Sequence, residues 1–234
     1  MNRKVKGDVI KHLQQFVTEE RWRTMNDVLS KRTRHLTVVL EDLYQPHNAS
    51  AVLRSCDCFG VQDVHIIENE NKFDPSKGVT IGSDQWLSLN YYNKQEGNNT
   101  IRCYERLRNE GYQLIATTPH TDDITIDDIS TQKKTALIFG SELTGLSEAA
   151  LTGADGYARI PMVGFSESFN ISVSAALSLY ELSNRIRKSK DLEWSLTEEE
   201  KLDLRYKWLK NSIRAADKII DRYLKEKEKG KNPS

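Results

Sequence analysis

LTVVLEDLYQPHNASAVLRSCDCFGVQDVHII, residues 36–67, contains three consecutive elements that indicate the fold class. Residues 36–40 are a short apolar run bounded by charge, which predicts a buried strand. Residues 46–60 have a possible asparagine cap near their start and a glycine at their end, as is typical of a helix. Residues 61–67, which include Val61, Val64, Ile66 and Ile67, predict a second strand. A strand, a helix and a strand in succession favour parallel pairing of the two strands.

The same alternation continues along the chain. The pattern predicts a helix over about residues 100–109, a strand over 113–118, and a further strand over 136–139 that ends at Gly140. Each strand is a short run and not an alternating pattern, which is typical of strands that are covered on both faces. We therefore expect an α/β fold with a mainly parallel sheet and helices on both faces of that sheet.

Helices are also predicted at both ends of the chain. Apolar residues recur at helical spacing over residues 9–17, and Thr18 begins a second short helix. After the predicted sheet, residues 170–188 indicate one long helix and residues 196–224 another. Residues 225–234 are dominated by charged and polar side chains, which predicts disorder.

The net charge of zero results from an uneven distribution of 34 basic and 34 acidic residues. Residues 1–35 hold nine basic and four acidic residues, and residues 185–234 hold fifteen and ten, so each end carries +5. Residues 36–184 hold ten basic and twenty acidic residues, which gives −10. Such ends can attract a polyanion that the middle would repel, although basic runs are more often only solvated surface.

Composition excludes several classes of protein. The three cysteines are an odd number, and no signal peptide is visible, so we expect a reducing, cytoplasmic compartment. No apolar run approaches the roughly 18 residues of a membrane span. The glycine-rich and serine-centred motifs of nucleotide-binding proteins and hydrolases are absent, and neither the cysteines nor the histidines have the spacing of metal ligands. We expect no metal site.

Three polar clusters follow predicted strands, at the edge where open α/β sheets bind their ligands. They are His47-Asn48 with Arg54, Gly140-Ser-Glu-Leu-Thr-Gly145, and Ile160-Pro-Met162 with Ser168-Phe-Asn170. Each cluster also has a purely structural interpretation: a helix cap with an ion-paired arginine, an ordinary turn between strand and helix, and a second helix cap.

Together and in this order, the clusters resemble the three motifs of the SPOUT methyltransferases, and among them the TrmH-type RNA ribose 2′-O-methyltransferases. The resemblance covers about residues 36–184, and it rests on Asn48-x5-Arg54, Gly140-x-Glu142-x2-Gly145, and Ile160-Pro-Met with Ser168-x-Asn170. The stretch from Leu36 to Val61 is most similar to the tRNA (guanosine-2′-O) methyltransferase branch of this family.

The resemblance implies a deep trefoil knot in the C-terminal part of the core, a pocket for S-adenosylmethionine, and a homodimer with active sites at the interface. By matching positions, the cofactor would contact Thr117, Gly140, Ile160 and Phe169. The catalytic and substrate-binding group would be Asn48, Arg54, Glu142, Ser168 and Asn170. The sequence departs from the family pattern at Leu143, Glu167 and Phe169.

The resemblance also implies a division of the chain and a substrate. Residues 1–35 would be a basic helical extension that binds tRNA, residues 36–184 the SPOUT methyltransferase domain, and residues 185–234 a basic helical C-terminal extension. The expected target is the 2′-hydroxyl of guanosine 18 in the D-loop of tRNA. Two alternatives stay open: the same chemistry on rRNA or another tRNA position, and a non-catalytic RNA-binding protein.

Overall fold

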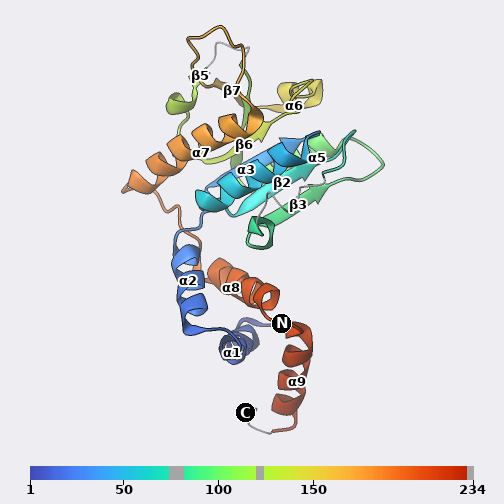
Figure 1. Cartoon of the computed structure of the whole chain (residues 1–234), viewed down its shortest axis with the longest axis vertical. Helices are drawn as coiled ribbons and strands as arrows, with labels where there is room; N and C mark the ends of the chain where they lie inside the picture. Colours follow the sequence, from blue (N-terminus) through green and yellow to red (C-terminus); the bar gives the residue numbers. More distant parts are fainter. Residues whose placement is uncertain (74–81, 120–123, 231–234) are drawn as a thin grey trace. The chain divides into compact units, whose positions relative to one another are not determined.

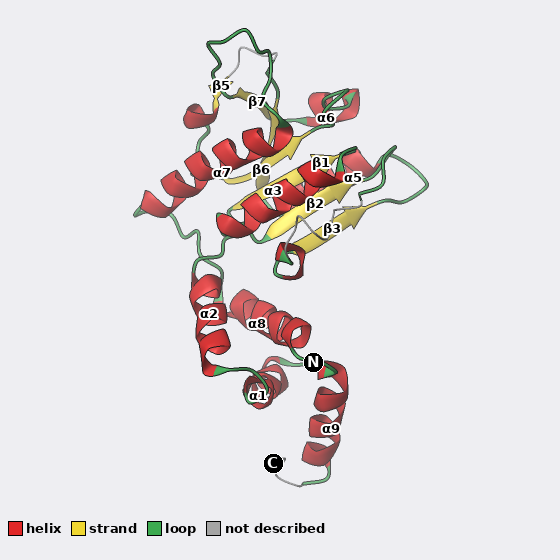
Figure 2. Cartoon of the chain, viewed as in Figure 1, coloured by secondary structure: helices red, strands yellow, loops and turns green. Residues whose placement is uncertain are grey.

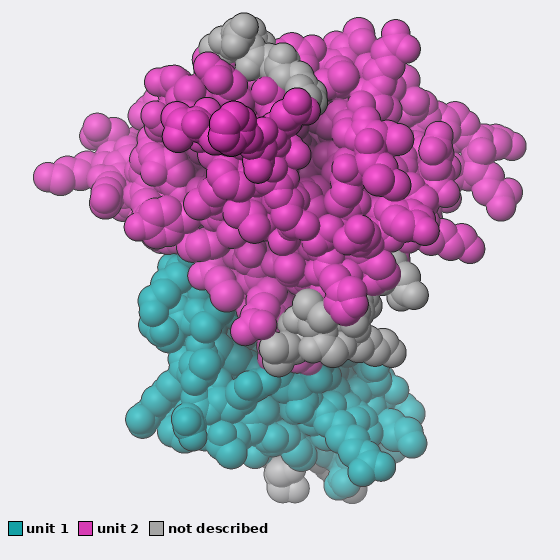
Figure 3. Space-filling view, turned by 45° about the horizontal axis from the view of Figure 1, so that its top comes forward, with its two compact units in different colours: residues 1–32, 195–234 teal, residues 33–194 magenta. Residues whose placement is uncertain are grey.

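A computed structural model of the chain describes residues 1–73, 82–119 and 124–230. It divides into two compact units, which Figure 3 distinguishes by colour. Unit 1 consists of residues 1–32 and 195–234, and unit 2 consists of residues 33–194. The boundaries expected from the sequence, after residues 35 and 184, lie three and ten residues from the ends of unit 2 at residues 32 and 194.

Unit 2 is built on a seven-stranded sheet in which all the pairings are parallel (Figure 2). The strand order across the sheet is β3-β2-β1-β6-β4-β7-β5. The strands are β1 (Leu36–Glu41), β2 (Asp63–Ile67), β3 (Ser88–Tyr92), β4 (Tyr112–Thr117), β5 (Ile124–Thr125), β6 (Lys134–Phe139) and β7 (Gly156–Arg159). The predicted α/β class and parallel sheet are therefore confirmed.

Helices pack on both faces of this sheet. One face is covered by α3 (Pro46–Cys58) and α7 (Ile171–Lys188), and the other by α5 (Asn99–Asn109) and α6 (Glu148–Gly153) (Figure 1). Val38 packs in the core cluster beneath α3 and α7, whereas the next residue, Val39, packs in the cluster beneath α5. Because neighbouring strand residues point to opposite faces, a strand covered on both sides must be apolar throughout.

The four strands that the sequence predicts all form, but β3, β5 and β7 escape prediction. β3 has the sequence SLNYY and is only partly buried, because it pairs with β2 alone at one edge of the sheet. β5 has two residues and β7 has four. Short or half-exposed strands lack the continuous apolar run on which the prediction depends.

The start of α3 differs from the expectation. Asn48 is not the cap of this helix: the cap position is Gln45, whose side chain makes no capping hydrogen bond, and Pro46 opens the helix. Proline suits the first helical position because its nitrogen has no hydrogen to leave unpaired. The amide of Asn48 therefore stays available for other contacts. The expected glycine stop is confirmed, since Gly60 follows the helix with φ of +75°.

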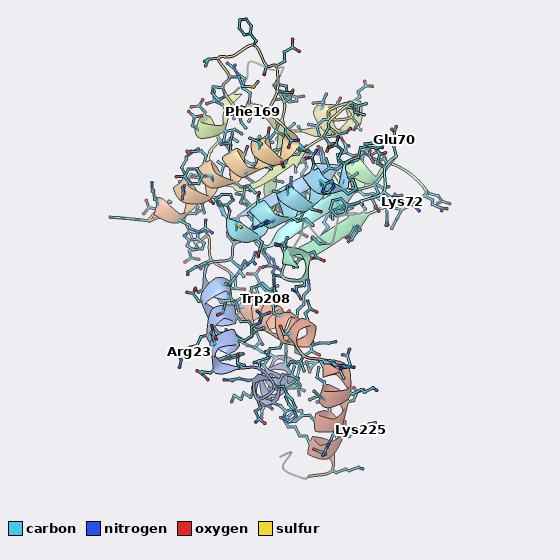
Figure 4. All side chains as sticks on the ribbon, viewed as in Figure 1. Arg23, Glu70, Lys72, Phe169, Trp208 and Lys225 are labelled. Atoms are coloured by element: carbon cyan, nitrogen blue, oxygen red, sulfur yellow. The ribbon has the colours of Figure 1, made fainter. Side chains whose placement is uncertain are left out.

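Unit 1 is a helical cluster made from both ends of the chain. It contains α1 (Arg3–Gln14), α2 (Glu19–Ser30), α8 (Glu198–Ser212) and α9 (Ala216–Glu228). Thr18 caps α2 as predicted, because its side chain accepts a hydrogen bond from the Arg21 backbone. The core of unit 1 contains the buried side chains of Leu13, Leu29 and Trp208, the last of which is labelled in Figure 4. Helices from the two ends thus share one core.

Two predictions for the C-terminal part are wrong. The single helix expected over 196–224 is divided, because Ala215 adopts a φ of +59°, which cannot continue a right-handed helix. Helix α9 then continues to Glu228, so residues 225–228 are helical and not disordered. Residues 231–234 lie outside the described residues. No helix in the described part of the chain is long and apolar enough to cross a membrane.

Candidate active site

A cavity opens at the edge of the sheet where β4, β6 and β7 end. Its volume is about 530 Å³, which is in the range of small-molecule sites. The first turn of α3 and the start of α7 complete its wall. Parallel sheets bind ligands at this edge because the connections that follow the strands leave backbone groups free there.

The loop after β6, residues 140–146, forms one wall of the cavity. It closes on itself through two backbone hydrogen bonds between Ser141 and Gly145, of 2.9 and 3.0 Å. Gly145 has a φ of +69°, which glycine adopts without strain. A Cβ atom on Gly140 would lie 2.3 Å from the carbonyl carbon of Gly145. Only glycine therefore fits where the loop begins.

The far end of this loop is held by Glu41, a residue that sequence reasoning missed. Glu41 is the last residue of β1 and is 1% exposed. Its carboxylate accepts hydrogen bonds from the backbone N–H and the hydroxyl of Ser147, at 2.9 and 2.8 Å, and from the hydroxyl of Thr100. The only sequence signal is a charge directly after an apolar run, which indicates the end of a strand and not a buried anchor.

Hydrogen bonds between side chains connect the three sequence clusters. The Nδ2 of Asn170 donates to the Oδ1 of Asn48 at 3.1 Å, and the Nδ2 of Asn48 donates to the Oε1 of Glu142 at 2.6 Å. Asn170 lies 122 positions from Asn48 along the chain, and Asn48 lies 94 positions from Glu142. Asn48 is 8% exposed, so its amide is committed to this network.

The expected cofactor contacts all line the cavity. Thr117 stands at the end of β4, where its hydroxyl donates to the carbonyl of Ile138 at 2.7 Å. Gly140 and Ile160 follow β6 and β7, and Phe169, which Figure 4 labels, precedes α7. The structure brings these four positions to the same cavity.

Four members of the expected catalytic group also line the cavity, whereas the fifth does not. Asn48, Glu142, Ser168 and Asn170 belong to the lining. Asn170, and not Ser168, caps α7, because its Oδ1 accepts a hydrogen bond from the Ser172 backbone at 2.8 Å. Arg54 lies further along α3, is exposed, and has no ion pair among the described residues.

Two charged groups in the cavity wall each have a buried atom without a partner among the described residues. Glu142 is the single acidic residue and Arg159 the single basic one among the described residues of the lining. The Oε2 of Glu142 and the Nε of Arg159 are buried, and neither has a hydrogen-bond partner among the described residues. The carboxylate of Glu142 turns inward, whereas the side chain of the neighbouring Leu143 is 82% exposed.

The described residues contain no group of three or more His, Cys, Asp or Glu side chains that could hold a metal ion. His65, the one histidine among the described residues with a large pKa shift, is buried. Burial lowers the pKa of His65 to about 4, because the charged imidazolium is poorly solvated there. It hydrogen-bonds to the hydroxyl of Tyr92, at 3.0 Å, and not to the cavity.

A parallel sheet with a glycine-walled cavity at its carboxyl edge and an amide–carboxylate network defines an α/β enzyme that binds a small cofactor. The chain belongs to the SpoU rRNA Methylase family, whose model matches residues 35–180. A tRNA (guanosine(18)-2′-O)-methyltransferase of Borreliella burgdorferi is 41% identical over 210 residues, which cover 88% of this chain and 94% of the relative.

Solved structures agree with this assignment. The TrmH/SpoU tRNA modifying enzyme of A. aeolicus matches with a TM-score of 0.74 and 29% identity, over 84% of this chain and 98% of that one. The SpoU methyltransferase AviRb of Streptomyces viridochromogenes, in complex with the cofactor AdoMet, matches with a TM-score of 0.59 and 25% identity, over 70% and 65% of the two chains. The resemblance and the SPOUT fold are confirmed; the knot and the homodimer remain predictions.

Proposed function

We propose that this protein transfers a methyl group from S-adenosylmethionine to the ribose 2′-hydroxyl of guanosine 18 in tRNA. The observation that carries the proposal is the hydrogen-bonded set of Asn48, Glu142 and Asn170 on the wall of the cavity. A protein that only bound RNA would need neither this buried network nor a small-molecule cavity. Relatives from Borreliella burgdorferi and Thermus thermophilus that carry the name of this activity support the choice of substrate.

The residues of the cavity fit the cofactor. S-adenosylmethionine, when bound, supplies a methyl group on a positively charged sulfur. The backbone at Gly140 lines the cavity, and the absence of a side chain there lets the loop pack tightly against Gly145 and Leu146. The free Oε2 of Glu142 provides an acceptor for a cationic or hydrogen-bonding group, which the network through Asn48 holds in place. No metal ligand is required for methyl transfer, in keeping with the predicted absence of a metal.

A ribose 2′-hydroxyl is a poor nucleophile, so its proton must leave as the oxygen attacks the methyl carbon. Arg54 is assigned to this step. A guanidinium with a pKa above about 12 does not act as a free base. It would instead bind the neighbouring phosphate, so that the phosphate or a water accepts the proton, or it would stabilise the developing negative oxygen.

Arg54 does not line the cavity of its own chain, and this favours the homodimer that the family resemblance implies. In such a dimer the Arg54 of one subunit would complete the cavity of the other. The exposed face of α7 supports the idea, because Val173, Leu177 and Tyr180 are 43%, 43% and 58% exposed at helical spacing. A stripe of large apolar side chains on a surface helix is typical of an interface.

A single substitution in the RNA tests the target. We expect transfer of labelled methyl from S-adenosylmethionine to tRNA to vanish when guanosine 18 carries a 2′-deoxyribose, because the acceptor oxygen is gone. A loop nucleotide can be splayed out and recognised at its 2′-hydroxyl, which is harder for a paired residue. The control is tRNA with the deoxyribose at the neighbouring nucleotide. Full labelling of the substrate that lacks the 2′-hydroxyl of guanosine 18 would contradict this target and favour another tRNA position or rRNA.

The basic residues of unit 1 are proposed to bind the tRNA backbone. Residues 1–32 hold eight basic and four acidic residues, and residues 195–234 hold eleven and eight, so unit 1 carries +7. Unit 2 carries −7, because the whole chain is neutral. Phosphate is therefore attracted to the helical unit and repelled by the acidic one. Cytoplasmic tRNA is the natural substrate in this proposal.

Replacing exposed lysines by glutamine tests this role better than deletion, because the first 32 residues supply core residues such as Leu13 and Leu29. The unit 1 set, Lys4, Lys11 and Lys225, and the control set in unit 2, Lys133, Lys188 and Lys190, are all exposed. We expect the unit 1 triple variant to flatten the slope of log affinity against log salt by about 2–3. The control set should leave that slope unchanged, and equal slopes for both variants would exclude unit 1 as the RNA-binding surface.

A further inference from the structure

Arg159 lines the cavity but has no role in the methyl transfer proposed above. It is the last residue of β7, and its neighbour Ala158 packs in the core cluster beneath α7. Because adjacent strand residues point to opposite faces, Arg159 extends from the other face of the strand, at the edge where the cavity opens. Neither the sequence motifs nor the family resemblance singled it out.

The guanidinium of Arg159 has no protein partner in the part of the chain that the structure describes. It forms no ion pair or side-chain hydrogen bond there, and its buried Nε is without an acceptor. A buried donor without a partner costs free energy, and arginine cannot avoid this cost by losing its proton. A group in this state is expected where a ligand supplies the missing acceptor.

The charge of the cavity indicates what this acceptor is. Arg159 is the single cation among the described lining residues, and Glu142 is the single anion. A planar guanidinium fork matches a carboxylate, which it can bind through two parallel hydrogen bonds. The amino-acid end of S-adenosylmethionine carries one carboxylate and one ammonium group, so its charges complement those of the wall.

We propose that Arg159 binds the α-carboxylate of S-adenosylmethionine and of its product, S-adenosylhomocysteine. This inference rests on the proposed function, because it presumes that the cavity is the cofactor site. A phosphate of the RNA is the competing acceptor. The burial of Nε within a cavity wall favours a small ligand that enters the cavity over a backbone phosphate on the surface.

Binding measurements without turnover separate these possibilities. The dissociation constants of S-adenosylhomocysteine and of its decarboxylated analogue, which lacks only the carboxylate, are measured by calorimetry for the wild type, Arg159→Gln and Arg159→Lys. We expect Arg159→Gln to weaken binding of S-adenosylhomocysteine about 10- to 100-fold, because a charge-assisted hydrogen bond is lost. The dissociation constant of the analogue should stay almost unchanged. Arg159→Lys should lose less, because it keeps the charge without the planar fork.

The analogue reports whether the cavity is still folded in each variant. Lys133→Gln is the charge-matched control, since Lys133 is exposed and precedes β6, at the opposite end of the strand from the cavity. Equal weakening of both ligands by Arg159→Gln, or no weakening of either, would overturn the proposal. The competing phosphate contact would then be supported if the variant bound tRNA less tightly. A wild-type protein that failed to bind S-adenosylhomocysteine would contradict the proposed function itself.

Discussion

Arg54→Ala is expected to abolish methyl transfer while S-adenosylhomocysteine binds as tightly as it does to the wild type. Arg54 does not line the cofactor cavity of its own chain, and its proposed role is at the ribose hydroxyl, so its loss should slow the transfer without disturbing cofactor binding. We expect the rate to fall at least about 10²-fold, as for other groups that stabilise developing charge. Single-turnover transfer of labelled methyl to tRNA, with cofactor affinity from calorimetry, measures both effects.

Arg54→Lys is the informative companion variant. A lysine keeps the positive charge but loses the planar fork that binds a phosphate at two oxygens, so we expect little recovery of the rate. Arg54 is exposed and has no ion pair among the described residues, so neither change should alter the melting temperature. A near-normal rate for Arg54→Lys would show that the positive charge alone suffices. A near-normal rate for Arg54→Ala would show that Arg54 has no part in the mechanism.

Mixing two inactive variants tests whether Arg54 acts across a dimer. A heterodimer of Arg54→Ala and Asn170→Ala subunits would hold one site with both residues intact if Arg54 reaches the partner subunit. Random mixing of a twofold dimer then restores about a quarter of the wild-type rate. If Arg54 acts within its own chain, each site carries one defect and the mixture stays inactive. Analytical ultracentrifugation establishes the oligomeric state of each variant.

Gly140→Ala is expected to remove cofactor binding and to destabilise the protein. The added methyl group would lie 2.3 Å from the carbonyl carbon of Gly145 and 2.5 Å from the nitrogen of Leu146. Both are backbone atoms, so the loop must open to relieve the clash. Overpacking of this kind costs about 1–3 kcal/mol of stability. Thermal unfolding and calorimetry with S-adenosylhomocysteine measure the two consequences.

Gly164→Ala is the matched control for this substitution. Gly164 lies in the loop between β7 and α7, a Cβ atom there would meet nothing within 4 Å, and its backbone does not need the left-handed region. We expect cofactor affinity and melting temperature close to those of the wild type. Cofactor binding by Gly140→Ala at wild-type affinity would mean that the loop moves freely and is not part of the site.

Local patterns in the sequence were sufficient for the α/β class and for most of its elements. The run Leu36–Leu40 is apolar except at Thr37, and this is a direct consequence of a strand covered on both faces. The edge strand β3 was not predictable in the same way, because its sequence SLNYY is neither continuous nor strictly alternating. Unit 1 was predicted as two separate extensions, since helical periodicity does not reveal that Leu29 and Trp208 share one core.

The residue types of the site were visible in the sequence, but their connections were not. Asn48 looked like a helix cap, and only the folded chain brings its amide between Glu142 and Asn170. Glu41 and Arg159 had no motif to mark them, because a buried carboxylate and an unpaired guanidinium are defined by what surrounds them in space. Periodicity and spacing act over a few residues, whereas these contacts join positions about a hundred residues apart, which depends on the order in which the strands pair.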